Sequence, residues 1–465
     1  MLQHPANSIH SADKQISSPS EKNRISESYK VVFFLFLSLV FIIPAFFYNT
    51  PHEIWTGCIK ILLSPANLLT DYIQLANIGA ALVNVGIMIL VSVGMVKVNG
   101  LVIDGKIIAA IFTVAGFSFF GKNLFNSIPI TLGVLLFAKI KRKKFKDYIL
   151  QALFGTALGP LVSEFCFNLG LSVFPGLLFG VIMGIIAGFL IPPLAESFTK
   201  FHHGFNLYNI GFTSGIIGMF FLAILRSMGI DVKAVSVISS GNNLFFSILL
   251  YSIFTIMLLC GLYINKWSFK GYRELLEQTG KGGPDFTELS GLGLTIINMA
   301  LLGFLATSYV LVIGGELNGP TIGGILTVVG FGATGKHLRN VIPIIIGVFI
   351  AKLLNIYEHN STAAIIVALF GTTLAPVSGY YGVIPGIIAG ILHMALTMNI
   401  GILHGGMNLY NNGFSGGFIA AVMIPVLNSI MTKKQPSVQM TATSDMLKKT
   451  IGENQQSYFG ADKRT

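Results

Sequence analysis

The sequence predicts an all-α integral membrane protein built from two inverted-topology repeats of about seven transmembrane segments each, with broken or short helices near the midplane. Three observations predict this class. The composition is 53% hydrophobic and 11% charged, and the mean hydropathy is +0.74, whereas soluble domains carry roughly 25% charged residues. Apolar segments follow one another along the chain, and its two halves share motifs. A soluble globular protein is excluded, because such helices need lipid around them.

Most of the apolar segments approach the roughly 20 residues that span a bilayer. In the first half they lie at 31–48, 74–97, 106–120, 127–139, 148–166, 172–193 and 209–228. In the second half they lie at 244–265, 289–313, 320–334, 341–356, 362–379, 383–400 and 411–431. The segments 106–120 and 127–139 are short, and the sequence leaves open whether they cross fully or form a re-entrant pair.

The basic residues predict the topology, because cytoplasmic loops retain Lys and Arg. Three clusters follow the fourth, eighth and fourteenth segments: Lys139, Lys141, Arg142, Lys143, Lys144 and Lys146; Lys266, Lys270 and Arg273; Lys433 and Lys434. If both termini are cytoplasmic, all three clusters lie on the cytoplasmic side of a plasma membrane. Arg226 and Lys233 lie on the opposite side and are exceptions to this rule. The first cluster lies between apolar segments, so we expect no nucleic-acid partner. The stretch 53–70 contains charges and Pro65, and we expect it at the interface as an amphipathic or re-entrant element.

An internal duplication organises the chain. Residues 113–134 (TVAGFSFFGKNLFNSIPITLGV) and 327–348 (TVVGFGATGKHLRNVIPIIIGV) are identical at 13 of 22 positions, at an offset of 214. Two further motif pairs extend the match: ALFGTALGP (152–160) with ALFGTTLAP (368–376), and HHGFNLYNIGF (202–212) with HGGMNLYNNGF (404–414). The predicted organisation is a cytoplasmic tail (1–30), repeat 1 (31–228), a connecting loop (229–243), repeat 2 (244–431) and a second cytoplasmic tail (432–465). Seven crossings are an odd number, so the second repeat is inverted, as in many secondary transporters.

The first candidate site is the duplicated GK-x-L-x-N motif, which carries Lys122, Asn126, Lys336 and Asn340. Gly, Lys, Asn and Pro between two short apolar helices break the backbone and leave amide groups that need partners. A lysine beside such amides attracts anions. The alternative is a polar turn with lysines that extend toward the membrane surface. The pattern G-x-x-x-x-G-K also matches a P-loop, but no Ser or Thr follows either lysine, so nucleotide binding is excluded.

The second candidate site is the duplicated H-x-G-x-N-L-Y-N-x-G-F motif. Its imidazole, amide and phenol groups supply donors and acceptors for a small polar solute, and they belong to His202, Asn206, Tyr208, Asn209, His404, Asn408, Tyr410 and Asn411. A loop that caps helices with Asn is the alternative. We expect the two GK-x-L-x-N breaks and the two NLYN loops to meet and line one central site.

Other polar or small residues have weaker functional signals. Asp71 and Asp285 lie at the start of equivalent segments. Each carboxylate either couples transport to an ion or lies at the membrane interface, and the sequence leaves both alternatives open. The ladders Gly176, Gly180, Gly184, Gly188 and Gly382, Gly386, Gly390 predict close helix packing. Cys58, Cys166 and Cys260 are far apart, so we interpret them as buried apolar side chains and expect no metal site and no cofactor.

The two copies of GK-x-L-x-N-x-IPI and of NLYN-x-GF, with two polar tails, resemble a bacterial membrane-protein family called domain of unknown function 1576. The resemblance covers about residues 31–431 and implies a multispanning protein without supplying an activity. More distantly, NLYN-x-GF followed by FTSGIIG (212–218) or FSGGFIA (414–420) is similar to the Asn-Gly signature of urea-transporter repeats, although here the order is Asn-x-Gly.

These patterns favour a transporter for a small polar or anionic solute, because inverted repeats with duplicated breaks suit alternating access. A passive urea-like channel for a neutral solute is the alternative within this class. A membrane-embedded enzyme with His202 or His404 as base is the alternative from another class. No carboxylate or nucleophile recurs beside either histidine, so we expect no enzyme. The expected partners are the lipid bilayer and the solute, and homo-oligomer formation is left open.

Overall fold

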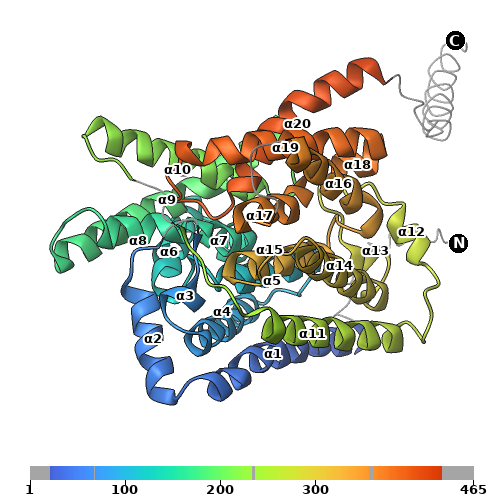
Figure 1. The fold of residues 1–465 in the computed structure, drawn as a ribbon, viewed down its shortest axis with the longest axis horizontal. Coiled ribbons are helices and arrows are strands. Elements are labelled where there is room, and N and C mark those ends of the chain that lie inside the picture. Colours follow the sequence, from blue (N-terminus) through green and yellow to red (C-terminus); the bar gives the residue numbers. More distant parts are fainter. Residues whose placement is uncertain (1–20, 67–68, 233–235, 355–359, 432–465) are drawn as a thin grey trace, which may run out of the picture. The chain divides into compact units, whose positions relative to one another are not determined.

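The computed structural model describes residues 21–66, 69–232, 236–354 and 360–431 (Figure 1). The chain divides into a unit of residues 1–422 and a unit of residues 423–465, and the described part of the second unit is residues 423–431. Most of the two predicted tails, and with them Lys433 and Lys434, lies outside the described residues, as does Lys233. The first helix begins at Glu21, ten residues inside the predicted N-terminal tail.

The described chain is almost entirely helical. The first half contains α1 (Glu21–Tyr48), α2 (Pro51–Leu63), β1 (Leu69–Thr70), α3 (Tyr72–Leu75), α4 (Ile78–Val98), α5 (Gly105–Phe117), α6 (Leu124–Ile140), η1 (Phe145–Tyr148), α7 (Ile149–Gly155), η2 (Thr156–Leu158), α8 (Gly159–Phe167), α9 (Val173–Phe201), α10 (Asn209–Ser227) and β2 (Ser236–Val237). The second half contains α11 (Asn243–Ile264), α12 (Tyr272–Leu276), α13 (Phe286–Leu289), α14 (Leu292–Val312), α15 (Gly319–Phe331), α16 (Leu338–Leu354), α17 (Thr362–Gly371), η3 (Thr372–Leu374), α18 (Ala375–Tyr381), α19 (Val383–Ile400), η4 (Gly401–Leu403) and α20 (Asn411–Ile430).

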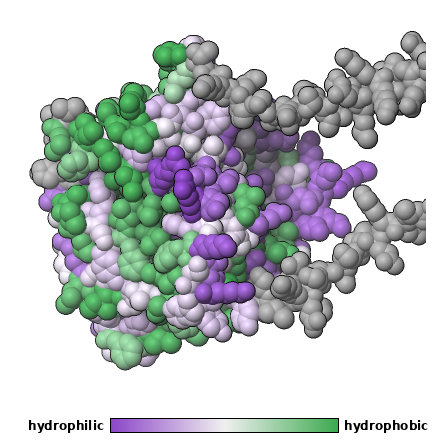
Figure 2. Space-filling view, turned by 90° about the vertical axis from the view of Figure 1, so that its right-hand side faces the viewer, coloured by the Kyte–Doolittle hydropathy of each residue, from purple (hydrophilic) through white to green (hydrophobic). Residues whose placement is uncertain are grey.

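Ten helical stretches in the described part of the chain are long and apolar enough to cross a membrane, and two of them, Phe145–Phe167 and Thr362–Tyr381, are runs of shorter helices joined by 3-10 turns. The predicted all-α membrane class is therefore confirmed, and the chain is a multi-pass membrane protein. Hydrophobic side chains cover much of the face in Figure 2, and hydrophilic side chains gather toward one side of it. The short segments are separate helices: α5 and α15 have 13 residues each. Such a helix is about 20 Å long, less than the roughly 30 Å hydrocarbon core.

The helix bounds of the two halves repeat at the same offset as the sequence motifs. Three consecutive helices of the first half, α4, α5 and α6, have the bounds of α14, α15 and α16 shifted by 214 positions. The segment 148–166 is interrupted by the 3-10 turn η2, and its counterpart is interrupted at the equivalent place by η3. The duplication in the sequence is thus also a duplication of local structure.

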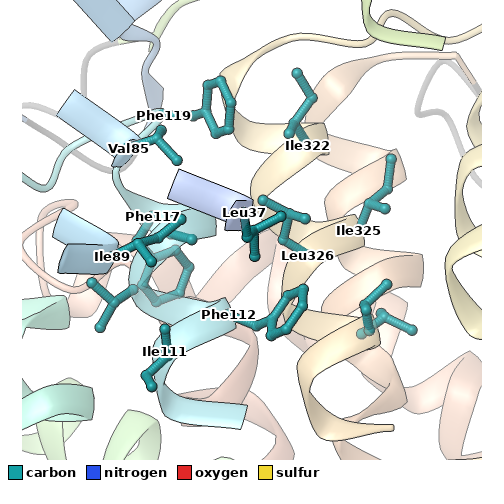
Figure 3. Close-up of a cluster of buried hydrophobic side chains, with 14 of the residues drawn as sticks. Leu37, Val85, Ile89, Ile111, Phe112, Phe117, Phe119, Ile322, Ile325 and Leu326 are labelled. Atoms are coloured by element: carbon teal, nitrogen blue, oxygen red, sulfur yellow. The ribbon is translucent and has the colours of Figure 1, made fainter. Parts of the chain in front are cut away.

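The helices α5 and α15 pack against each other within the hydrophobic core (Figure 3). Gly105, at the start of α5, lies close to the carbonyl oxygen of Ala333, just beyond the end of α15. Gly319, at the start of α15, lies close to the carbonyl oxygen of Phe119, just beyond the end of α5. The two equivalent helices therefore run antiparallel. Phe112 on α5 and Leu326 on α15 are among the side chains that fill the space between them.

Capping residues explain where these elements begin. Asp104 accepts a hydrogen bond from the backbone of α5 and Asn318 from the backbone of α15, each as the N-cap residue. Within the predicted interfacial stretch 53–70, residues 53–63 belong to α2 and residues 69–70 form β1. The helix begins before this stretch because Thr50 and Glu53 make a capping box. Hydrogen bonds from the backbone and side chain of Thr50 lower the pKa of the Glu53 carboxyl.

The glycine ladders pack as expected, with one exception. Gly188 lies close to the carbonyl oxygen of Ile130 on α6, and Gly390 lies close to that of Ile344 on α16. Gly382 is wrongly placed in the ladder: it separates α18 from α19 with φ of 99° and has open space beside it. The interpretation of the cysteines as buried is wrong for Cys260, which is exposed on the spanning helix α11.

Candidate functional site

The GK-x-L-x-N motifs form two break segments, residues 118–123 between α5 and α6 and residues 332–337 between α15 and α16. One asparagine from the preceding long helix holds each break. The amide of Asn84 donates to the carbonyl oxygens of Ser118 (2.7 Å) and Lys122 (3.0 Å). The amide of Asn298 makes the equivalent pair of bonds, 2.8 Å each. Backbone groups that the breaks free inside the protein are thereby satisfied.

Asn126 and Asn340, on the helices that follow the breaks, also hydrogen-bond to the backbone of the break segments. The Oδ1 of Asn126 accepts from the backbone of Asn123, and its amide donates to the carbonyl oxygen of Gly121. Asn340 makes the equivalent bonds with His337 and Gly335. Both asparagines are fully buried. These two predicted binding residues therefore cap the helices that follow the breaks.

The expectation that the two breaks lie together is wrong. Because α5 and α15 are antiparallel, the break after α5 lies at the start of α15, and the break after α15 lies at the start of α5. The two breaks are thus at opposite ends of the helix pair, about 20 Å apart along the axes.

The two NLYN loops do meet. The amide of Asn206 donates to the carbonyl oxygen of Gly413 (2.9 Å), and the amide of Asn408 donates to that of Gly211 (3.2 Å). Each asparagine also accepts from the backbone of the tyrosine two residues later. The rings of Tyr208 and Tyr410 contact each other, with centroids 5.0 Å apart. Asn206 and Asn408 therefore fasten the two halves together at the start of α10 and α20.

The histidines of the motif brace the same loops. The Nε2 of His202 lies 2.9 Å from the Oδ1 of Asn209, and His404 and Asn411 repeat this contact at 2.9 Å. The amide of Asn209 donates to the carbonyl oxygen of Ala195 on the preceding helix α9. Both imidazoles are buried. These four side chains tie each loop to the helix before it.

The two equivalent lysines of the duplication, Lys122 and Lys336, have different hydrogen-bond partners. The Nζ of Lys336 donates to the Oη of Tyr208 and, at 2.7 Å, to the Oγ1 of Thr372. The Nζ of Lys122 donates at 3.4 Å to the carbonyl oxygen of Leu153. The hydroxyl of Tyr410 has no hydrogen-bond partner within the described structure. Only one of two equivalent lysine–tyrosine pairs is therefore formed.

A cavity of about 260 Å³ reaches this tyrosine pair. Its walls come from both halves: His202, Asn206, Tyr208 and Asn209 line one side, and Phe331, Thr334 and Tyr410 line the other. Lys106 is the one charged side chain among the lining residues, all of which the structure describes. The cavity therefore offers hydrogen-bond donors and acceptors with a positive charge at its wall.

Comparison with protein families assigns the chain. A family model described as "Protein of unknown function (DUF1576)" matches residues 50–227 and 264–429. The chain belongs to this family. The two matched stretches start 214 residues apart, the offset of the internal duplication. No curated protein and no solved structure matches the chain, so the likeness to urea-transporter repeats has no support from these comparisons.

In this DUF1576 protein neither predicted coupling carboxylate lines the cavity, although the backbone of Asp285 pairs with that of the cavity residue Thr334. Asp71 is fully buried, and its carboxylate accepts from the hydroxyl of Ser239 (2.6 Å) and the backbone of Gly319 (3.1 Å). Asp285 accepts from the backbone and hydroxyl of Thr287. Both residues are N-caps of short helices, α3 and α13.

Sequence reasoning missed three contributors to the DUF1576 site. Lys106 and Thr334 line the cavity, and neither is shared by the other half, where Pro320 and Phe120 stand. Thr372 binds Lys336, and its signal was present in the duplicated ALFGT motif, since Thr156 is the equivalent residue.

Proposed function

We propose that this DUF1576 protein transports a small polar or anionic solute between its two halves, through the cavity that ends at Tyr208 and Tyr410. The observation that carries the proposal is that cavity: both halves line it, and its one charged wall residue is Lys106. A positive wall residue without an acidic neighbour in the lining favours a solute that bears hydrogen-bond acceptors or negative charge. The proposal includes no enzymatic activity.

The antiparallel packing of α5 and α15 supports an inverted arrangement of the two repeats. Equivalent helices that run in opposite directions are expected when one repeat enters the membrane from the opposite side. With the basic clusters inside, we place both termini in the cytoplasm and the protein in the plasma membrane.

The unequal lysine–tyrosine pairs suggest how access alternates. In the described state Lys336 binds Tyr208, whereas Tyr410 lacks a hydrogen-bond partner. Inverted repeats can exchange conformations, so that each adopts the arrangement of the other. In the second state of our proposal, Lys122 binds Tyr410 while Lys336 is released, and the cavity opens toward the opposite side.

Reconstitution tests the proposal. The purified protein is placed in liposomes, and uptake of labelled monocarboxylates, inorganic anions and urea is measured for wild type, Lys106→Met, Lys336→Met and the control Lys270→Met. Lys270 is exposed and outside the cavity. We expect the wild type and the control to take up anions, and we expect Lys106→Met and Lys336→Met to lose this uptake. Urea flux that is indifferent to both lysines would support the passive channel instead, and the absence of any protein-dependent flux would contradict transport.

A further inference from the structure

A second cavity, about 110 Å³ in volume, lies beside Lys122. Its walls include Met88 and Val91 on α4, and Ser127 and Leu132 on α6. No residue lines both this cavity and the one at the NLYN loops. We call it the Lys122 crevice.

The lysine at the end of this crevice is poorly partnered. Lys122 is 1% exposed, and its one side-chain hydrogen bond among the described residues, to the carbonyl oxygen of Leu153, is 3.4 Å long, whereas a charged donor normally bonds at about 2.7–2.9 Å. The ion pairs within the described part of the chain do not include it. A buried ammonium without a counter-charge is strongly unfavourable in a membrane. An anionic acceptor in the crevice would therefore stabilise the charged form of Lys122.

A hydroxyl in the same crevice also lacks a partner. The Oγ of Ser127 is buried and has no hydrogen-bond partner in the part of the chain that the structure describes, and Ser127 lines the crevice with Thr131. The second half has Val341 and Ile345 at the equivalent positions. The duplicated fold therefore does not need these hydroxyls, and their presence is specific to the Lys122 crevice.

Apart from Ser92 and Thr156, whose hydroxyls donate to carbonyl oxygens of Met88 and Leu153, the remaining walls are apolar. They reach the outside of the protein between two membrane helices. Ile128 and Leu132 on α6 are 48% and 44% exposed, and Val91 on α4 is 37% exposed. These side chains line the crevice and belong to long apolar helices, so their exposed surfaces face lipid. The crevice thus joins a buried positive charge to the hydrocarbon region.

We propose that the Lys122 crevice binds the carboxylate of a single-chain amphiphile, such as a long-chain fatty acid, which enters sideways from the bilayer. Lys122 is the counter-ion and Ser127 donates a hydrogen bond to the carboxylate. A cavity of about 110 Å³ has room for the head and a few methylene groups, since a water occupies about 30 Å³. A phospholipid head group with two chains is too large for this space. The rest of the acyl chain lies against α4 and α6 in the lipid.

Occupation of the crevice has one consequence that rests on the proposed function. A carboxylate bound to Lys122 holds that lysine away from Tyr410, so it keeps the protein in the described state and slows transport. The binding itself needs no transport, and it is therefore measured separately.

Photolabelling tests the proposal. The full chain, in nanodiscs of defined phosphatidylcholine, is labelled with a diazirine analogue of palmitate, and the labelled peptides are mapped by mass spectrometry. We expect label on the peptides that contain Val91 and Ile128, displaced by palmitate but not by hexadecanol or acetate. Lys122→Met should reduce labelling about tenfold, the effect of losing a charged hydrogen bond. Ile128→Trp, which fills the opening, should do the same.

Lys270→Met is the control, because Lys270 is exposed and lines neither cavity, and it should leave the label at α4 and α6 unchanged. Ser127→Ala, a small change, should weaken labelling even if Lys122→Met folds poorly. Unchanged labelling in Lys122→Met and Ser127→Ala overturns the proposal. Equal displacement by hexadecanol would mean that the charge plays no part, and displacement by acetate would assign the crevice to a small soluble anion. Either result also overturns it.

Discussion

The Nζ of Lys336 donates a hydrogen bond to the Oη of Tyr208, a residue of the opposite half and 128 positions away. The equivalent phenol, Tyr410, has no such partner within the described structure. Thr113 lies beside Tyr410, but its hydroxyl donates to the carbonyl oxygen of Ala109. This difference between two equivalent tyrosines separates their expected mutational effects.

Tyr208→Phe should lower the stability of the described state, and Tyr410→Phe should not. Removing the Tyr208 hydroxyl takes one of two side-chain partners from a buried ammonium, which corresponds to about 1–3 kcal/mol. Removing the Tyr410 hydroxyl takes no partner from a buried ammonium, because Lys122 bonds to the carbonyl oxygen of Leu153 instead. The measurement is the unfolding free energy in mixed micelles. Equal losses in the two variants would contradict the described asymmetry.

Transport should depend on both tyrosines, although stability depends on one. If Lys122 binds Tyr410 in the second state, Tyr410→Phe and Lys122→Met each remove the same bond and should slow solute flux about tenfold, or about 1.4 kcal/mol. The double variant should be no slower than either single variant. Additive losses in liposome flux would argue against the exchange of pairs.

Asn206→Ala and Asn408→Ala should weaken the junction between the halves. Each asparagine donates across to the other half and accepts from its own loop, so truncation leaves buried backbone groups unpaired at about 1–3 kcal/mol each. Asn399→Ala is the control, because Asn399 is on an exposed helix surface and bonds within its own helix. Thermal unfolding of the three variants is the measurement. An equal loss of thermal stability in Asn399→Ala would contradict the role of Asn206 and Asn408 in holding the two halves together.

The helices could be predicted from local properties of the sequence, whereas the contacts between the two halves could not. The lengths of the apolar segments and the duplicated motifs were sufficient to predict α4, α5, α6 and their counterparts. The reason is that a helix in lipid satisfies its backbone hydrogen bonds within its own segment. The contact of Asn206 with Gly413, 207 positions later, depends on how the halves pack. The separation of the two breaks was missed because it depends on α5 and α15 packing against each other along their lengths, a contact that no motif encodes.

The sequence predicted only part of the site, because its motifs identify residues but not the contacts between the two halves. Duplication identified Lys122, Lys336, Tyr208 and Tyr410, but identical motifs in both halves cannot reveal which lysine–tyrosine pair is formed in one state. Lys106 carries no duplicated signal, because Pro320 stands at the equivalent position.

Gly116→Ala should destabilise the seam between α5 and α15. A Cβ at Gly116 would lie 2.6 Å from the carbonyl oxygen of Gly323, so the two helices must move apart, at about 1–3 kcal/mol. Gly94→Ala is the control, since Gly94 is on α4 with open space around it, and should be neutral or slightly stabilising. Thermal unfolding of both variants tests this, and equal behaviour would contradict the close approach.

Cysteine labelling tests the inverted topology. In a chain without its three native cysteines, Lys143→Cys after α6 and Asn360→Cys before α17 should react with an impermeant maleimide from opposite sides of the membrane. The reason is that the two loops follow equivalent helices of oppositely oriented repeats. Labelling of both from the same side would exclude inversion.

The carboxylate of Asp71 has a consequence for biosynthesis. Its partners Ser239 and Gly319 lie 168 and 248 positions further along the chain, so the ribosome has not yet made them when α3 and α4 enter the bilayer. A nascent first half therefore holds a buried acid with one carboxylate oxygen bonded to the backbone of Ile73 and the partners of the other oxygen still missing, and it completes its own interior only after α15 has been inserted. The first half should accordingly be unable to mature as an isolated fragment, and premature termination before residue 319 should yield a substrate for membrane proteases.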